Sequence, residues 1–326
     1  LLSLLSLPAM LGQGYDRSLA AGTVCGAGTL GILIPPSIML VIMADQLALS
    51  VGDLFMGAVF PGLILGTLYI SYILLRSNLW PESAPLSPDL QEFSWFMMWD
   101  VFKSILPPVF LILAVLGSIF AGITTPTEAS GVGALGAILL AAYNHNLNFS
   151  VLKEVTYAAF KTTAYIFAIF LGATCFALVL RELGGDELVE RAITGLPFGK
   201  YGILIFILLI VFLLGFLLDW IEITLIILPL LSPIVDSLGF EIEGFGTMDE
   251  PDLIWFTLLV AVALQTSFLT PPVGFALFYL KGVCPPEIKM VDIYKGVAPI
   301  IILQLIGLTL VVLFPTIVTW LPSVAY

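Results

Sequence analysis

Gly31-Ile32-Leu33-Ile34-Pro35-Pro36-Ser37-Ile38 and Ser267-Phe268-Leu269-Thr270-Pro271-Pro272-Val273-Gly274 are the two stretches that decide the fold of this chain. In each of them a Pro-Pro pair interrupts apolar sequence that is long enough to cross a bilayer. Proline has no backbone N–H and cannot continue a helix, and it pushes the residue before it out of the helical region. Each stretch also follows a shorter apolar segment that contains a proline, Leu7-Pro8 in one case and Leu228-Pro229 in the other. Two breaks in matching contexts predict discontinuous helices around a site at the membrane midplane, which is the pattern of a secondary transporter.

The composition is that of an integral membrane protein. Of the 326 residues, 60% are hydrophobic and only 10% are charged, and the mean hydropathy is +1.12. Soluble domains carry about 25% charged residues. The apolar runs are continuous and do not alternate with polar residues, so we expect helices and not a β-barrel to span the bilayer. We therefore predict an all-α integral membrane protein with inverted repeats, discontinuous helices and a re-entrant hairpin.

The charge distribution predicts the orientation of the spans. The net charge is −12, which argues against nucleic-acid binding. The loop 236–252 contains no Lys or Arg, and its acidic residues are Asp236, Glu241, Glu243, Asp249, Glu250 and Asp252. If this loop faces the periplasm, all basic residues face the cytoplasm except Arg181, Arg191 and Lys200. That bias agrees with the positive-inside rule only if the segment at about 200–236 is a hairpin that returns to the side from which it enters.

The apolar runs also divide the chain into two inverted repeats. We expect 1–76 to be the end of the first repeat, with a hairpin arm, the first broken helix and one span. An interfacial loop with aromatic anchors follows at 77–103. The second repeat covers 104–326 and contains scaffold spans, the re-entrant hairpin, the second broken helix at 253–280 and a final span at 297–321. Because the chain begins with Leu1 inside an apolar run, we expect it to be a fragment in which the first repeat is incomplete.

Backbone oxygens at the two breaks are candidate ligands for a cation. A broken helix leaves carbonyls without intrahelical partners, and hard cations such as Na⁺ prefer oxygen ligands. The candidate metal ligands are Gly31, Ile34 and Pro36 at the first break and Ser267, Thr270 and Val273 at the second. The proline pairs should hold the carbonyls of Gly31, Ile34, Ser267 and Thr270 away from helical partners. The alternative is that both pairs are kinks in ordinary packed helices.

Polar side chains near the breaks are further candidates. The candidate substrate-binding residues are Thr29, Ser37, Thr224 and Thr270. Asp219 and Glu222 stand between two apolar arms, at the tip of the predicted hairpin. A carboxylate at membrane depth is costly unless it lines a cavity, so we predict a role in ion binding or gating. The alternative is that these carboxylates reach water or pair with a basic residue.

A third motif predicts the start of a helix. Thr125-Pro126-Thr127-Glu128 has the pattern of a capping box, with Thr125 at the N-cap and Glu128 at the third helical position. The glycines that follow it permit close packing against another helix; they are Gly131, Gly133 and Gly136. We predict a structural role for this motif.

Several motifs together are similar to one family. They include Thr29-Leu30-Gly31-Ile32-Leu33-Ile34-Pro35-Pro36-Ser37-Ile38, Leu7-Pro8-Ala9-Met10, Gly14-Tyr15-Asp16, Thr125-Pro126-Thr127-Glu128-Ala129, Leu218-Asp219-Trp220, Leu269-Thr270-Pro271-Pro272-Val273-Gly274 and Gly282-Val283-Cys284-Pro285-Pro286. In these motifs, and in their order along the whole chain, the sequence resembles the large membrane subunit of the TRAP (tripartite ATP-independent periplasmic) transporters, the DctM-like family. The N-terminal spans and most of a first hairpin would be missing.

The resemblance implies a multi-pass protein of the bacterial inner membrane without enzymatic activity. It implies an elevator-type, Na⁺-driven importer of small organic anions such as C4-dicarboxylates. It also implies two partners, a small membrane subunit and a periplasmic substrate-binding protein. The chain departs from the family at Ser267, where Gly is usual, and at Glu222, where a smaller residue is expected.

Two other functions fit parts of the sequence. A Na⁺-coupled anion transporter that works without a binding protein would have similar broken helices, and an adjacent gene for a secreted binding protein would separate the two. An intramembrane aspartyl protease would need a Tyr-Asp pair and a Gly-x-Gly-Asp motif in spans. Tyr15-Asp16 supplies the first, but Gly184-Gly185-Asp186 lacks the first glycine and lies in a polar stretch.

Overall fold

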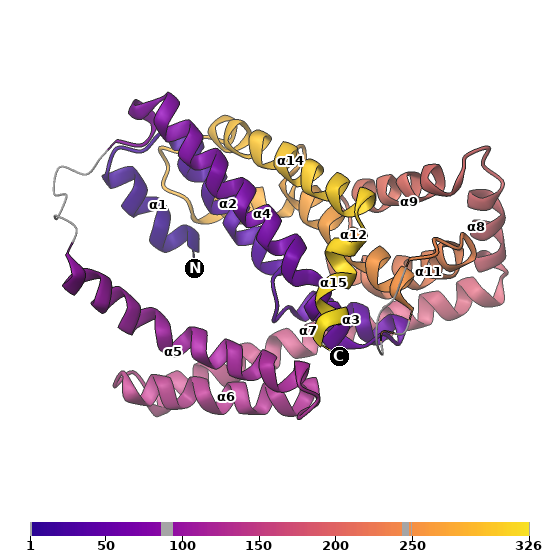
Figure 1. Ribbon diagram of the computed structural model, residues 1–326, viewed down its shortest axis with the longest axis horizontal. Helices are drawn as coiled ribbons and strands as arrows, with labels where there is room; N and C mark the ends of the chain where they lie inside the picture. Colours follow the sequence, from indigo (N-terminus) through magenta and orange to yellow (C-terminus); the bar gives the residue numbers. More distant parts are fainter. Residues whose placement is uncertain (1, 86–93, 243–247, 249, 326) are drawn as a thin grey trace. The chain divides into compact units, whose positions relative to one another are not determined.

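The computed structural model describes residues 2–85, 94–242, 248 and 250–325, and all regular secondary structure in this part of the chain is helical (Figure 1). These residues contain no β-strand. Within them, seven helical segments are long and apolar enough to cross a membrane. The segments are Arg17–Leu47, Val51–Leu79, Met97–Phe120, Phe149–Glu182, Trp220–Ser237, Pro251–Leu269 and Met290–Leu313. The predicted fold class, an all-α integral membrane protein, is confirmed.

The chain divides into two compact units, which we describe separately. The first unit contains residues 1–87 and 173–324, and the second contains residues 88–172. The boundary falls inside helix α7 (Phe149–Glu182). The repeat boundaries expected at residues 76 and 103 divide the chain differently, and they stay a prediction.

The first unit begins with the helices around the first Pro-Pro pair. They are α1 (Leu2–Gly12), α2 (Arg17–Leu33), α3 (Ile38–Leu47) and α4 (Val51–Leu79), followed by the 3-10 turn η1 (Pro81–Ser83). Polar side chains cap three of these helices: Asp16 accepts the N–H of Leu19, and Ser37 and Ser50 cap α3 and α4 in the same way. Because Pro35 and Pro36 offer no N–H, α2 stops at Leu33. The first predicted break is confirmed.

The second half of this unit contains the other Pro-Pro break. Its helices are α8 (Gly185–Thr194), α9 (Lys200–Leu214), α10 (Trp220–Glu222), the π-helical turn η2 (Ile223–Ile227), α11 (Leu228–Ser237), α12 (Pro251–Leu269), α13 (Phe275–Val283), α14 (Met290–Leu313) and α15 (Thr316–Ala325). The break between α12 and α13 falls at Pro271-Pro272, as predicted. The last candidate span is α14, Met290–Leu313, and not 297–321 as expected, because Pro315 ends α14 and the short helix α15 follows. Residues 243–247 and 249 of the acidic loop lie outside the described residues.

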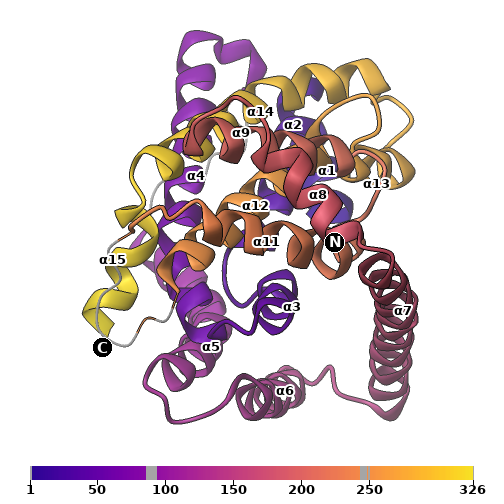
Figure 2. The same ribbon diagram turned by 90° about the vertical axis from the view of Figure 1, so that its right-hand side faces the viewer.

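Helix α12 forms the core of the first unit. Every residue from Leu253 to Leu269 is buried, and the helix packs against α2, α4, α9, α11 and α14. Figure 2 shows it between α11 and α14. A helix that is enclosed on all sides has no polar face to alternate with an apolar one, and α12 is accordingly apolar on most of its surface, with four buried polar residues: Thr257, Gln265, Thr266 and Ser267.

Two glycines allow α2 and α14 to form the most extensive helix pair of this unit. The helices approach most closely at Gly22 and Gly296, where a Cβ on either residue would overlap the backbone of the other helix. Small residues at such crossings let membrane helices gain van der Waals contact. Since α2 leads into the first break, this contact fixes the first elbow against the last long span.

The second unit consists of α5 (Trp95–Phe120), α6 (Pro126–Tyr143) and the first part of α7. The predicted capping box is confirmed, because the N–H of Thr125 donates to Glu128 Oε2 at 2.9 Å and the N–H of Glu128 donates to Thr125 Oγ1 at 3.3 Å. Gly133 and Gly136 of α6 face side chains of α5, whereas Gly131 faces open space.

A third Pro-Pro pair, Pro107-Pro108, lies inside α5 and does not interrupt it. The carbonyls that lose their helical donors there belong to Lys103 and Ser104. Both residues are exposed, and the helix nevertheless continues through the pair to Phe120. A proline pair by itself is therefore not sufficient to break a helix in this protein.

Candidate functional site

The first elbow, residues 34–37, leaves backbone carbonyls unpaired. The N–H of Ile34 donates to the carbonyl of Leu30 at 3.1 Å and closes α2. The hydroxyl of Ser37 donates to the carbonyl of Ile32, to which Pro36 cannot donate because it has no N–H. Among the described residues, nothing donates a hydrogen bond to the carbonyls of Gly31, Ile34 or Pro36. These three oxygens are available to a ligand, as the position of the proline pair predicts.

The second elbow, residues 270–274, is partly different from the prediction. The carbonyls of Thr270 and Val273 accept no hydrogen bond from any described residue. The carbonyl of Ser267 does accept one, from the N–H of Thr270 at 3.0 Å, so the expectation that it lacks a helical partner is wrong. Because Pro271 has no N–H, the last turn of α12 tightens and the i+3 donor replaces the missing i+4 donor. A carbonyl has two lone pairs, so the Ser267 oxygen keeps one acceptor site.

The hydroxyl of Thr270 is oriented by its own helix. It donates to the carbonyl of Thr266 at 2.8 Å. This hydrogen bond uses the proton of the hydroxyl and leaves its lone pairs free to accept a cation.

Helices α9 and α11 form the two arms of an antiparallel hairpin. The two arms contact each other at the open end of the hairpin. There Lys200 Nζ donates to the carbonyl of Gly239 at 3.3 Å, and the ring centroids of Tyr201 and Phe240 lie 5.4 Å apart. The turn at 215–219 forms its tip. Asp219 caps the short helix α10 by accepting the N–H of Trp220 at 2.8 Å.

Two polar groups just beyond the tip lack partners. Thr224 is fully buried, and neither its hydroxyl nor Glu222 Oε2 makes a hydrogen bond among the described residues. In a low-dielectric environment an unpaired polar group is costly, so both groups mark the tip as a place where a ligand or water would be stabilised.

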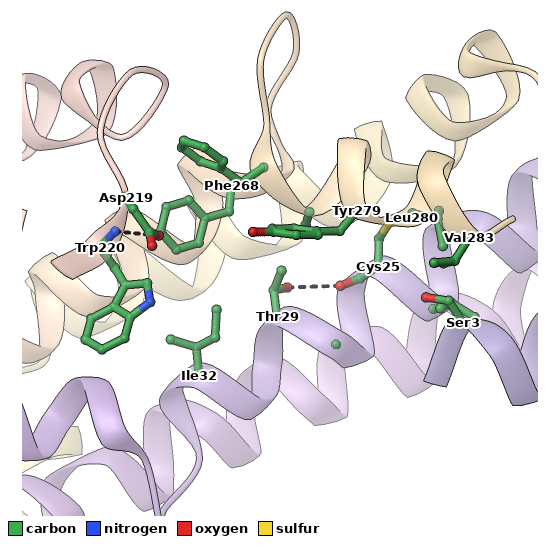
Figure 3. Close-up of a pocket in the computed structure, with 14 residues that line it drawn as sticks. Ser3, Cys25, Thr29, Ile32, Asp219, Trp220, Phe268, Tyr279, Leu280 and Val283 are labelled. Carbon is green, nitrogen blue, oxygen red and sulfur yellow. Dashed lines mark hydrogen bonds between the residues drawn. The ribbon is translucent and has the colours of Figure 1, made fainter. Parts of the chain in front are cut away.

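A cavity of about 480 Å³ lies between the tip and helices α1, α2, α12 and α13 of the first unit (Figure 3). It is lined by Ser3 of α1, Val24, Cys25, Gly28, Thr29 and Ile32 of α2, Asp219 and Trp220 of the tip, Phe268 of α12, and Phe275, Ala276, Tyr279, Leu280 and Val283 of α13. Asp219 is the one charged residue among these, and no Lys or Arg belongs to the described lining. Aromatic walls with a few convergent polar groups are typical of small-molecule sites.

The cavity brings together some of the predicted site residues and not others. Thr29 and Asp219 line it, and the Thr29 hydroxyl donates to the carbonyls of Cys25 and Gly26, each at 3.2 Å. Ser37, Thr224 and Thr270 are not among its lining residues. Their predicted role in substrate binding stays a prediction.

Sequence reasoning missed the aromatic wall of this cavity. Phe275 and Tyr279 are one helical turn apart on α13, and the lining residues of α2 and α13 follow the same spacing: i, i+1, i+4, i+5 and i+8. This spacing is visible in the sequence. What it does not reveal is that the two helix faces are turned toward each other.

Comparison with known proteins identifies the family. Residues 2–317 match the family model described as "Tripartite ATP-independent periplasmic transporter, DctM component". The chain is 30% identical over 316 residues to a putative TRAP transporter large permease protein of Haemophilus influenzae, with 96% of this chain and 73% of that protein covered. It is 29% identical over 335 residues to the C4-dicarboxylate TRAP transporter large permease protein DctM of Vibrio cholerae, covering 96% and 70%. It is also 29% identical over 314 residues to the isethionate TRAP transporter permease protein DctMQ of Oleidesulfovibrio alaskensis, covering 96% and 47%.

These matches confirm the resemblance seen in the sequence, and they describe a component of a transporter and not an enzyme. The chain belongs to the family of the DctM component of tripartite ATP-independent periplasmic transporters.

Proposed function

We propose that this chain is the membrane subunit of a Na⁺-driven, binding-protein-dependent transporter that imports a small organic anion across the bacterial inner membrane. The observation that carries the proposal is the pair of elbows with unpaired carbonyl oxygens. Gly31, Ile34 and Pro36 offer such oxygens at the first elbow, and Thr270 and Val273 offer them at the second. Unwound backbone of this kind coordinates coupling cations in secondary transporters.

The second elbow has the better-defined set of candidate oxygen ligands for a cation. The carbonyls of Thr270 and Val273, the hydroxyl of Thr270 and the remaining lone pair of Ser267 are all oxygens within one short segment. A hard monovalent cation prefers such neutral oxygens, and no acidic cluster is needed to hold it.

The anion would be held by dipoles and not by a basic side chain. Phe275 and Ala276 are the first residues of α13 and line the cavity, so the N-terminal N–H groups of that helix lie at its wall. A helix N-terminus carries a partial positive charge that favours anions. Because Asp219 opposes an anion in the same cavity, a cation bound at the adjacent elbow would lower the electrostatic cost of substrate binding. By linkage, the substrate would strengthen cation binding by the same factor.

The partners and the substrate class follow from the family and its members. The family description names a tripartite, periplasmic system, which supports a small membrane subunit and a periplasmic substrate-binding protein as partners. Relatives are named for C4-dicarboxylate, isethionate and sialic acid transport. We therefore propose an organic acid as the substrate, with C4-dicarboxylates as the first compounds to test.

Uptake by the purified protein in vesicles tests the whole proposal. We expect labelled C4-dicarboxylate to accumulate only with an inward Na⁺ gradient, the small subunit and a cognate binding protein. Equal uptake without the binding protein would favour a Na⁺-coupled transporter of a different kind. Uptake that ignores the Na⁺ gradient would contradict the proposed coupling.

A double variant, Pro271→Ala with Pro272→Ala, tests the second elbow alone. Alanine restores the missing N–H groups, and proline is about 3 kcal/mol less favourable than alanine inside a helix. We expect unchanged or higher thermal stability together with a smaller stabilisation by Na⁺, because the carbonyls return to intrahelical bonds. The matched control replaces Pro107 and Pro108, which lie inside the continuous helix α5, and should keep the full Na⁺ effect. A Pro271/Pro272 variant that keeps it too would rule out a cation site at this elbow.

A further inference from the structure

The end of α9 lies against the residue that precedes the second elbow by three positions. The hydroxyl of Ser267 donates to the carbonyl of Phe212 at 2.8 Å, and Ser267 is completely buried. In a longer helix this carbonyl would accept the N–H of Phe216, but that N–H donates to the carbonyl of Leu213. Ser267 therefore supplies the donor that the end of α9 lacks.

A glycine makes this contact possible. Gly215 directly follows α9, and a Cβ on it would lie 2.5 Å from Ser267 Oγ and 2.9 Å from Ser267 Cβ. Any larger residue at position 215 would push the hairpin away from α12. The approach of hairpin and elbow is thus set by a serine on one side and a glycine on the other.

Ser267 also belongs to the elbow through its backbone. Its carbonyl accepts the N–H of Thr270, so the residue is bonded to the elbow by its main chain and to the hairpin by its side chain. The hairpin tip that begins at Gly215 continues to Asp219 and Trp220, which line the cavity. A displacement of the elbow would therefore reach the wall of the cavity through one side-chain hydrogen bond and the turn at 215–219.

We propose that Ser267 is a positioning residue that couples cation occupancy of the second elbow to closure of the hairpin tip over the cavity. The inference rests on the proposed cation site. It adds the side chain through which that site would act on the tip. Without the hydroxyl the elbow can still bind a cation, but the bound state no longer favours one position of the hairpin.

Thiol labelling of the tip measures this coupling directly. Leu217 lies in the tip and is 75% exposed, so Leu217→Cys serves as the reporter in a background where the three native cysteines are replaced by alanine. Na⁺ should slow labelling of the reporter by a soluble maleimide. With Ser267→Ala, the Na⁺ concentration for half-maximal protection should rise about three- to tenfold, which corresponds to the loss of one neutral hydrogen bond. Ser267→Thr, which keeps the hydroxyl, should restore the Na⁺ dependence.

Two further variants separate coupling from folding. Thr257→Val removes another fully buried hydroxyl of α12, one that bonds only to Leu253 of its own helix, and it should leave the protection curve unchanged. Gly215→Ala keeps Ser267 but displaces the hairpin, and it should shift the curve as Ser267→Ala does. It therefore supplies the measurement if Ser267→Ala does not fold.

The outcomes distinguish the two proposals. If Na⁺ protects the reporter and the curve does not move in Ser267→Ala or Gly215→Ala, the coupling role of Ser267 is wrong and the cation site stands. If Na⁺ has no effect on labelling even with Ser267 intact, and also gives no thermal stabilisation, the cation site fails and this inference fails with it.

Discussion

The contact between α2 and α14 predicts that replacing two glycines of α2 by alanine changes the free energy of unfolding in opposite directions. Gly22→Ala places a Cβ where the carbonyl of Gly296 lies. Gly28→Ala, in the same helix, places a Cβ where nothing lies within 4 Å. The two substitutions are chemically identical, so they differ only in what surrounds the added methyl group.

The magnitudes follow from two terms. Replacing glycine by alanine inside a helix gains about 1 kcal/mol from helix propensity. Inserting a methyl group into a packed interface costs about 1–3 kcal/mol. At Gly22 the obstacle is backbone and cannot move to another rotamer, so we take the upper end of that range. We then expect Gly22→Ala to lower the free energy of unfolding by about 2 kcal/mol and Gly28→Ala to raise it by about 1 kcal/mol.

Unfolding of the purified protein in a mixed-detergent titration measures both changes under one condition. Because the contact is reciprocal, Gly296→Ala should resemble Gly22→Ala: its Cβ would overlap the carbonyl of Ser18. If Gly22→Ala were as stable as Gly28→Ala, the two helices would not cross at this point and the packing described here would be refuted.

Three other predictions concern single residues. Trp255→Phe should destabilise the protein by about 1–3 kcal/mol, because Trp255 Nε1 is the donor, at 2.8 Å, to a Val311 carbonyl that has lost its helical donor to proline; an unchanged unfolding midpoint would mean that this carbonyl finds another donor. Thr270→Val should weaken the Na⁺ dependence of uptake at near-normal expression, since one candidate oxygen ligand is removed, and an unaltered Na⁺ activation curve would exclude the hydroxyl as a ligand. Finally, an impermeant thiol reagent applied from the periplasm should label Glu241→Cys and not Lys289→Cys, and the reverse pattern would overturn the orientation derived from the basic residues.

The elements with a local cause were predictable from the sequence. The two breaks follow from missing N–H groups at the proline pairs, and the start of α6 follows from Thr125 and Glu128, which are three positions apart. Each of these features depends on residues within one helical turn. The same holds for the spacing of apolar residues that defines the spans, so the fold class required no knowledge of tertiary contacts.

Three other features were not predictable in this way. Pro107-Pro108 looks like the other pairs, yet α5 continues through it. The Ser267 carbonyl was expected to lack a hydrogen bond, but the last turn of α12 tightens and the N–H of Thr270 donates to it. The hydrogen bond from Gln265 to Tyr69, at 3.4 Å, joins residues 196 positions apart. A proline pair alone therefore specifies neither whether a helix continues nor how its last turn closes, and the contact of Gln265 with Tyr69 depends on packing that no local pattern contains.

The burial of α12 has a consequence for how the second broken helix moves. Amide hydrogens exchange with solvent only when their hydrogen bonds open, and opening a helix that is enclosed on every side requires disrupting its neighbours as well. The amides of α12 should therefore be among the slowest to exchange in deuterated buffer. On the other side of the elbow, α13 has only Leu277 and Leu280 buried, while Phe278 and Tyr279 are 55% and 77% exposed. The elbow thus joins an arm that is enclosed by its neighbours to an arm whose side chains are largely exposed. Amide exchange should therefore be slow up to Leu269 and faster beyond Gly274, and α13 can change its position without opening the hydrogen bonds of α12.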